Sequence, residues 1–189
     1  MVSLRHSICN VLSCGISLIK LTGLKLIYWR NLQFSIIERL SPNVVINLDG
    51  KSKIEIGNRV SIHSGSRISA VFGGCLKIHK NTSMNVGCII TCRKDIEIGE
   101  NVAIGPNVMI FDHDHIMEKV NGVKNSSFKV DKIRIGNNTW IGAGSIILRG
   151  TSIGDNCIIA AGSIVKGSIP DNTVLIQKRE NTYLKEIIQ

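Results

Sequence analysis

The chain has 189 residues, which suits one domain with a sizeable core, and its aromatic share of only 4% means that this core has to be aliphatic. The formal net charge of +9 favours an anionic partner, such as the phosphates of a cofactor or a membrane surface. Because no block of five or more basic residues occurs, nucleic acid is the least favoured of these partners, and we expect no nucleic-acid binding.

Residues 1–43 form the first expected element, an amphipathic helical segment. The apolar stretch SICNVLSCGISLI (residues 7–19) is too short to span a bilayer, and it lacks the small-residue cleavage site of a secretion signal. Cationic and interfacial aromatic residues punctuate the stretch that follows: Lys20, Lys25, Tyr28, Trp29 and Arg30. Two alternatives stay open, a helical cap packed on the domain and a helix that lies on an anionic membrane surface.

From residue 44 onward the chain repeats with a period of six residues. Aliphatic residues occupy every sixth position from Ile135 to Val165, and the same spacing occurs in three earlier stretches. A longer period of about 20 residues overlies it and brings back KIEIG, LKIHK, DIEIG and KIRIG. A period of six within a longer one predicts three short strands per turn of a solenoid, with about six turns between residues 44 and 173.

Units of the form [Ile/Val]-Gly-x-x-[Ser/Thr/Val]-x fill residues 44–176, most regularly in IRIGNNTWIGAGSIILRGTSIGDNCIIAAGSIVKGSIPDNTV (residues 133–174). These units resemble the hexapeptide-repeat acyltransferases, in particular their branch of sugar and polysaccharide O-acetyltransferases. The resemblance implies an all-β fold, a left-handed parallel β-helix of about six coils with a short N-terminal helical segment and a protruding loop. It also implies a homotrimer that uses acetyl-CoA as its co-substrate. The handedness comes from the resemblance alone.

The repeat breaks at FDHDHI, residues 111–116. Asp114 stands where the repeat has a small or β-branched residue, and residues 116–132 then form a polar external loop. A break in a regular array is a place where function is expected. After the coils, we expect residues 177–189 to form a C-terminal tail with a short helix.

Alignment on the family pattern gives His115 the role of the catalytic base that stands before the external loop. An imidazole that titrates near neutrality can accept the proton of an acceptor hydroxyl while this hydroxyl attacks the thioester of acetyl-CoA. Asp112 or Asp114 would fix the tautomer of this imidazole, and the sequence does not decide between them. For His113, a role in shaping the substrate site and no role at all stay open. We group Asp112, His113 and Asp114 with the substrate-binding residues.

Other positions match the family's contacts to acceptor and cofactor. Asn85, one coil before the histidines, matches an asparagine that contacts the acceptor sugar in the galactoside and maltose acetyltransferase branch. The family binds CoA in a groove between the coils of two subunits, and the matching positions are Trp140, Ala143, Ala161, Lys166, Lys178 and Arg179. Lys166 is displaced by one residue from the family lysine. Lys178 and Arg179 are assigned to the CoA phosphates only from their place in the sequence.

The favoured function is acetyl transfer from acetyl-CoA to a sugar hydroxyl in capsular, exopolysaccharide or lipopolysaccharide biosynthesis. We expect a cytoplasmic enzyme, and a place at the inner membrane face if the acceptor is a lipid-linked oligosaccharide. The alternatives are an acetyltransferase with a small non-sugar acceptor, a scaffold without catalysis and a γ-class carbonic anhydrase-like zinc protein. The zinc protein would use His79, His113 and His115, and their poor spacing leads us to expect no metal.

Overall fold

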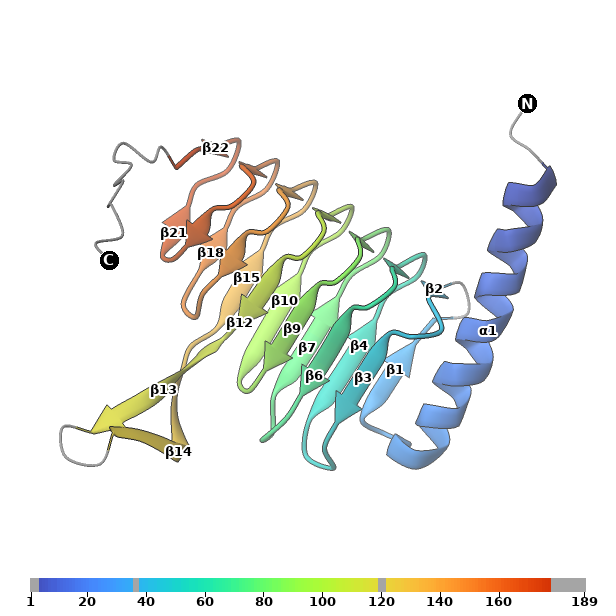
Figure 1. Cartoon of the computed structure of the whole chain (residues 1–189), viewed down its shortest axis with the longest axis horizontal. Coiled ribbons are helices and arrows are strands. Elements are labelled where there is room, and N and C mark those ends of the chain that lie inside the picture. Colours follow the sequence, from blue (N-terminus) through green and yellow to red (C-terminus); the bar gives the residue numbers. More distant parts are fainter. Residues whose placement is uncertain (1–3, 36–37, 119–121, 178–189) are drawn as a thin grey trace, which may run out of the picture.

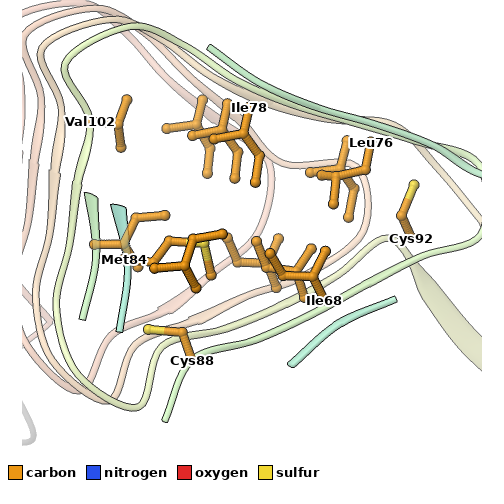
Figure 2. Packing of buried hydrophobic residues seen from close by; sticks show 14 of the residues in the cluster. Ile68, Leu76, Ile78, Met84, Cys88, Cys92 and Val102 are labelled. Carbon is orange, nitrogen blue, oxygen red and sulfur yellow. The ribbon is translucent and has the colours of Figure 1, made fainter. Parts of the chain in front are cut away.

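The structure is a computed structural model that describes residues 4–35, 38–118 and 122–177. Helix α1 (Leu4–Tyr28) comes first, and most of the remaining described chain winds into a solenoid of short parallel strands (Figure 1), which is triangular in section (Figure 2). The fold predicted from the sequence, a left-handed parallel β-helix with a short N-terminal helical segment, is therefore confirmed.

The strands of the coil form three parallel sheets, named A, B and C here. Sheet A consists of β1 (Leu32–Phe34), β4 (Lys53–Ile56), β7 (Cys75–Ile78), β10 (Asp95–Ile98), β15 (Ile133–Ile135), β18 (Ser152–Ile153) and β21 (Ser168–Ile169). Sheet B consists of β2 (Arg39–Leu40), β5 (Ser61–Ile62), β8 (Ser83–Met84), β11 (Ala103–Ile104), β16 (Trp140–Ile141), β19 (Ile158–Ile159) and β22 (Val174–Leu175). Sheet C consists of β3 (Val45–Leu48), β6 (Arg67–Ala70), β9 (Ile89–Cys92), β12 (Met109–Phe111), β17 (Ile146–Ile147) and β20 (Ile164–Val165).

The chain passes from sheet A to B to C in each coil, so three columns of corners run along the solenoid. We name them the A–B, B–C and C–A corners. The first coil contains β1 and β2 and so begins at Leu32, earlier than the residue 44 predicted from the sequence. The strand pairing shows this early start, because Leu32 pairs with Ile54 and Leu40 pairs with Ile62. The sequence did not indicate it, because neither leucine is followed by the glycine of the repeat.

The core is an aliphatic ladder inside the triangle. Ile104, Ile141 and Ile159 are paired partners in successive coils, and all three are buried. Figure 2 shows the same stacking for another part of the core, where side chains from neighbouring coils lie behind one another. Burying each of these side chains contributes roughly 1.5–3 kcal/mol. The period of six in the sequence is thus the repeat of this ladder.

The A–B corners carry a second ladder, made of asparagine side chains. Asn101 donates its amide N–H to Asn138 at 3.0 Å and accepts one from Asn81 at 3.0 Å, and the chain of bonds continues through Asn156 to Asn172. All five asparagines have a left-handed backbone, with φ between 54° and 60°. Asparagine tolerates this conformation better than most other residues, which explains its recurrence at these corners.

Helix α1 covers the open end of the coil. Leu21 is fully buried, and the Ser17 hydroxyl both donates to the carbonyl of Leu40 and accepts from its N–H. The Lys20 ammonium donates to the carbonyls of Pro42, at 2.8 Å, and Val44. Because an uncovered first coil would present an unpaired edge, the helix acts as a cap. None of the helices in the described residues has the length and hydropathy needed to cross a membrane.

The segment predicted as an external loop leaves the coil at a C–A corner as an antiparallel hairpin. It consists of β13 (His113–Glu118) and β14 (Gly122–Val130), which protrude from the solenoid (Figure 1). The hairpin starts three residues before the predicted loop, so both histidines of FDHDHI lie on β13. The predicted tail helix, residues 177–189, lies outside the described residues except for Gln177.

Candidate functional site

The C–A corner before the hairpin is organised around Asp112, whose side chain is fully buried. Its carboxylate accepts hydrogen bonds from the backbone N–H groups of Arg93 (2.8 Å), Lys94 (2.7 Å) and Asp95 (3.0 Å), and the thiol of Cys92 lies 3.5 Å away. A buried carboxylate needs such donors, because burying an unpaired charge is costly. Asp112 therefore ties the start of the hairpin to the preceding coil.

His113 is the histidine that lies beside this carboxylate. Its Nδ1 is 3.3 Å from Asp112 Oδ1, and its side chain is 12% exposed. Burial lowers the pKa of His113 below its usual value, the bond to Asp112 opposes this, and the nearby Arg93 lowers the pKa further. His113 is thus a largely neutral imidazole at neutral pH, held in place by Asp112.

His115, the predicted base, lies two residues further along β13 and is exposed to solvent. Its ring packs against Phe128 of β14, with 4.7 Å between the ring centroids. Among the described residues neither carboxylate bonds to it, because Asp112 is turned to His113 and Asp114 forms an ion pair with Arg149. The expectation that Asp112 or Asp114 fixes the tautomer of His115 is therefore not met in this chain.

A second group of predicted residues lines a small groove of about 150 Å³ on sheet B. Asn85 stands at a B–C corner and Trp140 projects from β16 with 55% of its surface exposed. The groove also contains His63 and Ser83, which were not among the residues predicted from the sequence. His63 could have been found from the repeat, because it occupies the position of Asn85 one coil earlier: the N–H of His63 donates to Met84 and that of Asn85 to Ile104.

Two more predicted cofactor residues continue the same B–C edge. Ala143 and Ala161 are both exposed, and the N–H of Gly162 donates to the carbonyl of Ala143 in the neighbouring coil. The coils touch closely here, since a Cβ on Gly105 would lie 2.7 Å from the backbone nitrogen of Ala143. Neighbouring coils are therefore in close backbone contact at this edge, and the small side chains of Ala143 and Ala161 are exposed on it.

Lys166 lies apart from this edge. It follows β20 at a C–A corner, on the same edge of the solenoid as the hairpin, and is exposed. Lys178 and Arg179, the other predicted phosphate contacts, lie outside the described residues.

One chain thus carries the predicted residues on two different edges. His113, His115 and Lys166 belong to the C–A corners, whereas Asn85, Trp140 and the two alanines belong to sheet B and the B–C corners. His79 of the zinc alternative lies at the end of β7, where its Nε2 is 2.9 Å from Glu97. One chain therefore does not bring His79 together with His113 and His115.

The repeats match a family model described as bacterial transferase hexapeptide (six repeats), over residues 132–167. Galactoside O-acetyltransferase of Escherichia coli K12 is 39% identical over 103 residues, which are 54% of this chain and 50% of that protein. A putative lipopolysaccharide biosynthesis O-acetyl transferase of the same organism is 28% identical over 130 residues, 65% of this chain and 66% of that protein. Residues 132–167 are therefore repeats of the bacterial hexapeptide transferase type, and the chain is similar to acetyltransferases.

A solved structure supports the same relationship for the hexapeptide-repeat chain. A galactoside acetyltransferase in complex with coenzyme A matches with a TM-score of 0.50 and 33% identity, over 60% of this chain and 58% of that one. The chain spans about half the length of several curated relatives, among them the galactoside O-acetyltransferase. The match alone therefore does not assign the activity, substrates or partners of those whole proteins to this chain.

Proposed function

We propose that this hexapeptide-repeat protein transfers an acetyl group from acetyl-CoA to a hydroxyl of a sugar. The observation that carries the proposal is the placement of His115, an exposed imidazole on a hairpin that interrupts an otherwise regular coil. The relatives with the galactoside and lipopolysaccharide O-acetyltransferase names support the same reaction. The solved relative with coenzyme A supports acetyl-CoA as the donor.

His115 would act as the general base. Its neutral imidazole takes the proton of the acceptor hydroxyl while the hydroxyl oxygen bonds to the thioester carbon. The carbon–sulfur bond then breaks, and the imidazolium returns the proton to the leaving thiolate of CoA. Such a base contributes typically 10²–10⁴-fold to the rate. His113, which Asp112 holds two residues before His115, would contact the acceptor.

We infer that the working site lies between subunits of a homotrimer. Within one chain, the edge with His115 and Lys166 is separate from the edge with Asn85 and Trp140. A second copy that sets its B–C edge against the C–A edge of the first would bring the two groups together. Acetyl-CoA would lie along the edge with Ala143 and Ala161, with Trp140 beside it and Lys166, Lys178 and Arg179 as candidate phosphate contacts.

The acceptor we propose is a sugar of a capsular, exopolysaccharide or lipopolysaccharide precursor, with Asn85 as a contact to it. Asn85 shares its groove with His63 and Ser83, so the groove offers amide, imidazole and hydroxyl groups. Such hydrogen-bonding groups suit a carbohydrate acceptor. An acceptor of this kind that is a lipid-linked oligosaccharide would meet the protein at a membrane surface.

The outer face of α1 supports a membrane contact of this kind. Ile19, Leu26 and Ile27 are each more than 70% exposed, and Trp29, directly after the helix, is 70% exposed. No acidic residue occurs in the helix, and the chain as a whole carries a charge of +9. An apolar helical face on a cationic protein suits an anionic membrane surface.

The transfer is tested first by calorimetry with acetyl-CoA, on the wild type and on His115→Ala. We expect both proteins to bind with micromolar affinity, because the base is not a contact that holds the cofactor. Screening sugars for release of the CoA thiol then follows, and His115→Ala should be slower by about 10²–10⁴-fold. Binding by neither protein would contradict the proposed reaction.

The membrane contact has a separate test. The helix is kept in this test, because its Leu21 is part of the core, and only exposed residues are changed. Vesicles of phosphatidylglycerol and phosphatidylcholine are sedimented with the wild type and with the double variant Ile19→Glu, Leu26→Glu. The matched control is Ile164→Glu, Val174→Glu, two exposed apolar residues on sheets C and B. We expect only the helix variant to lose co-sedimentation. Equal binding of all three proteins would contradict the contact.

A further inference from the structure

Three side chains from distant parts of the sequence meet at the C–A corners beside the hairpin. The guanidinium carbon of Arg93 lies 3.6 Å from the ring centroid of Phe128 and 4.4 Å from that of Phe72. The two rings are themselves 6.3 Å apart and tilted by 42°. Phe72, Arg93 and the hairpin belong to successive coils, so this Phe72–Arg93–Phe128 cluster joins two coil corners to β14.

The cluster departs from the ordinary rules of folding in two ways. Phe72 has a left-handed backbone with φ of 59°, a conformation that bulky residues rarely adopt. The Nε and Nη1 atoms of Arg93 are buried, and no hydrogen-bond acceptor for them is found among the described residues. Both features cost stability, so an arrangement that keeps them in a regular coil marks a place where a function is served.

The charge of Arg93 is balanced by Asp112, although the two side chains are not hydrogen bonded. Burial lowers the pKa of Arg93, and the nearby Asp112 carboxylate opposes this. The same carboxylate accepts the backbone N–H of Arg93 and holds Nδ1 of His113. Arg93 therefore has two links to the hairpin region, one from its backbone N–H to Asp112, directly before β13, and one from its guanidinium to Phe128.

Phe128 is the part of the cluster that reaches the histidines. It is the register partner of His115 across the hairpin, and their ring centroids are 4.7 Å apart. The ring of His113 also meets Phe128, edge-on at 5.7 Å. Since no carboxylate among the described residues holds His115, its contact with Phe128 is the one the structure offers to fix the orientation of the imidazole.

We propose that Arg93 is a positioning residue that, through Phe72 and Phe128, docks the hairpin on the coil and sets the orientation of His115. A planar cation that contacts two rings at once resists sliding of the hairpin, which a single aromatic contact would allow. The catalytic meaning of this positioning rests on the proposed acetyl transfer. The docking itself does not.

The docking is tested by NMR of the histidine ring protons, whose shifts report the ring current of Phe128. The variants are Arg93→Leu and Phe72→Leu, with Arg67→Leu as a control for removing an exposed arginine from the neighbouring strand β6. We expect the His115 resonance to move toward that of a free imidazole in Arg93→Leu, and by less in Phe72→Leu. Resonances of His63 and His79, on the other corners, should stay in place and show that the coils are intact.

A His115 resonance that is the same in Arg93→Leu, Phe72→Leu and the wild type would overturn the proposal. The Phe72→Leu variant decides the question if Arg93→Leu does not fold, because it leaves Arg93 and Asp112 in place. Activity gives a second readout once an acceptor is known. We expect kcat to fall by about 10²-fold in Arg93→Leu, as for a misplaced catalytic group, with an unchanged KM for acetyl-CoA.

The two arms separate the two proposals. A displaced His115 resonance without acetyl transfer by the wild type would leave the docking standing and remove the proposed function. A displaced resonance with an unchanged kcat would overturn the role of Arg93 as a positioning residue.

Discussion

Asp112 and His113 are neighbours both in the sequence and in space, with 3.3 Å between the Oδ1 of one and the Nδ1 of the other. The carboxylate does more than hold this imidazole. It also accepts three backbone N–H groups from residues 93–95, one coil earlier. The start of the hairpin and the placement of His113 therefore depend on one buried side chain.

Asp112→Asn should destabilise the protein by about 2–3 kcal/mol, because the amide N–H₂ group would face N–H donors that then lose their acceptor. Thermal unfolding followed by circular dichroism measures this as a lower Tm. Asp114→Asn is the matched control on the same turn, since its pair with Arg149 is part-exposed and should contribute at most about 1 kcal/mol. Equal Tm values for the two variants would contradict the anchoring role of Asp112.

Trp140 allows a test of the proposed cofactor edge, because Trp29, the other tryptophan of the chain, directly follows α1 and lies several coils away. In Trp29→Phe, the fluorescence of Trp140 should change when CoA is added. In Trp140→Phe, the remaining Trp29 should not respond. We expect Trp140→Ala to weaken CoA binding by about tenfold, the loss of one aromatic contact. A response that follows Trp29 instead would remove Trp140 from the cofactor site.

The solenoid was predictable because each coil places one aliphatic side chain per strand into the core, and this geometry writes a period of six into the sequence. The limits of the coil were less readable. Leu32 and Leu40 fill core positions of the first coil, yet the glycine that marks the later hexads does not follow them. The helical cap was one of two alternatives, and burial of Leu21 and the bonds of Ser17 identify it.

The sequence indicated which segment to inspect for a site, but not the contacts that its residues make. The break in the repeat pointed to the segment with His113 and His115. Which carboxylate serves which histidine depends on the backbone N–H groups of a different coil, and no pattern in the segment itself encodes that. The contact between Arg93, which follows β9, and Phe128 of β14 is likewise one between residues far apart in the sequence. Such contacts follow from the stacking register, which local sequence does not state.

The asparagine ladder at the A–B corners can be tested at Asn101, which bonds to an asparagine in each neighbouring coil. Asn101→Ala removes both hydrogen bonds and places alanine, which adopts a left-handed backbone poorly, at φ 57°. We therefore expect a loss of about 2 kcal/mol in the free energy of unfolding. Asn101→Gly also removes the hydrogen bonds, but glycine adopts a left-handed backbone without strain, so this variant should lose less stability. Urea denaturation of both variants gives the comparison. A greater loss for the glycine variant would show that backbone strain does not matter at this corner.

The buried carboxyl group of Glu38 should make the stability of the folded protein depend on pH. Its side chain is 2% exposed with Oε1 unpaired among the described residues, and burial raises its pKa from 4.5 to about 7. Because the folded state holds the proton more tightly, the stabilisation is fully present below pH 4.5 and is lost as the pH rises through about 7. The full difference is about 3 kcal/mol.

Wild type and Glu38→Gln are compared by urea denaturation at pH 5 and pH 8. We expect the wild type to lose most of this amount relative to the variant between the two pH values. Glu55→Gln, at a part-exposed glutamate on β4, is the control for removing a carboxylate. A pH-independent difference between wild type and Glu38→Gln would mean that Glu38 does not carry a proton in the folded protein.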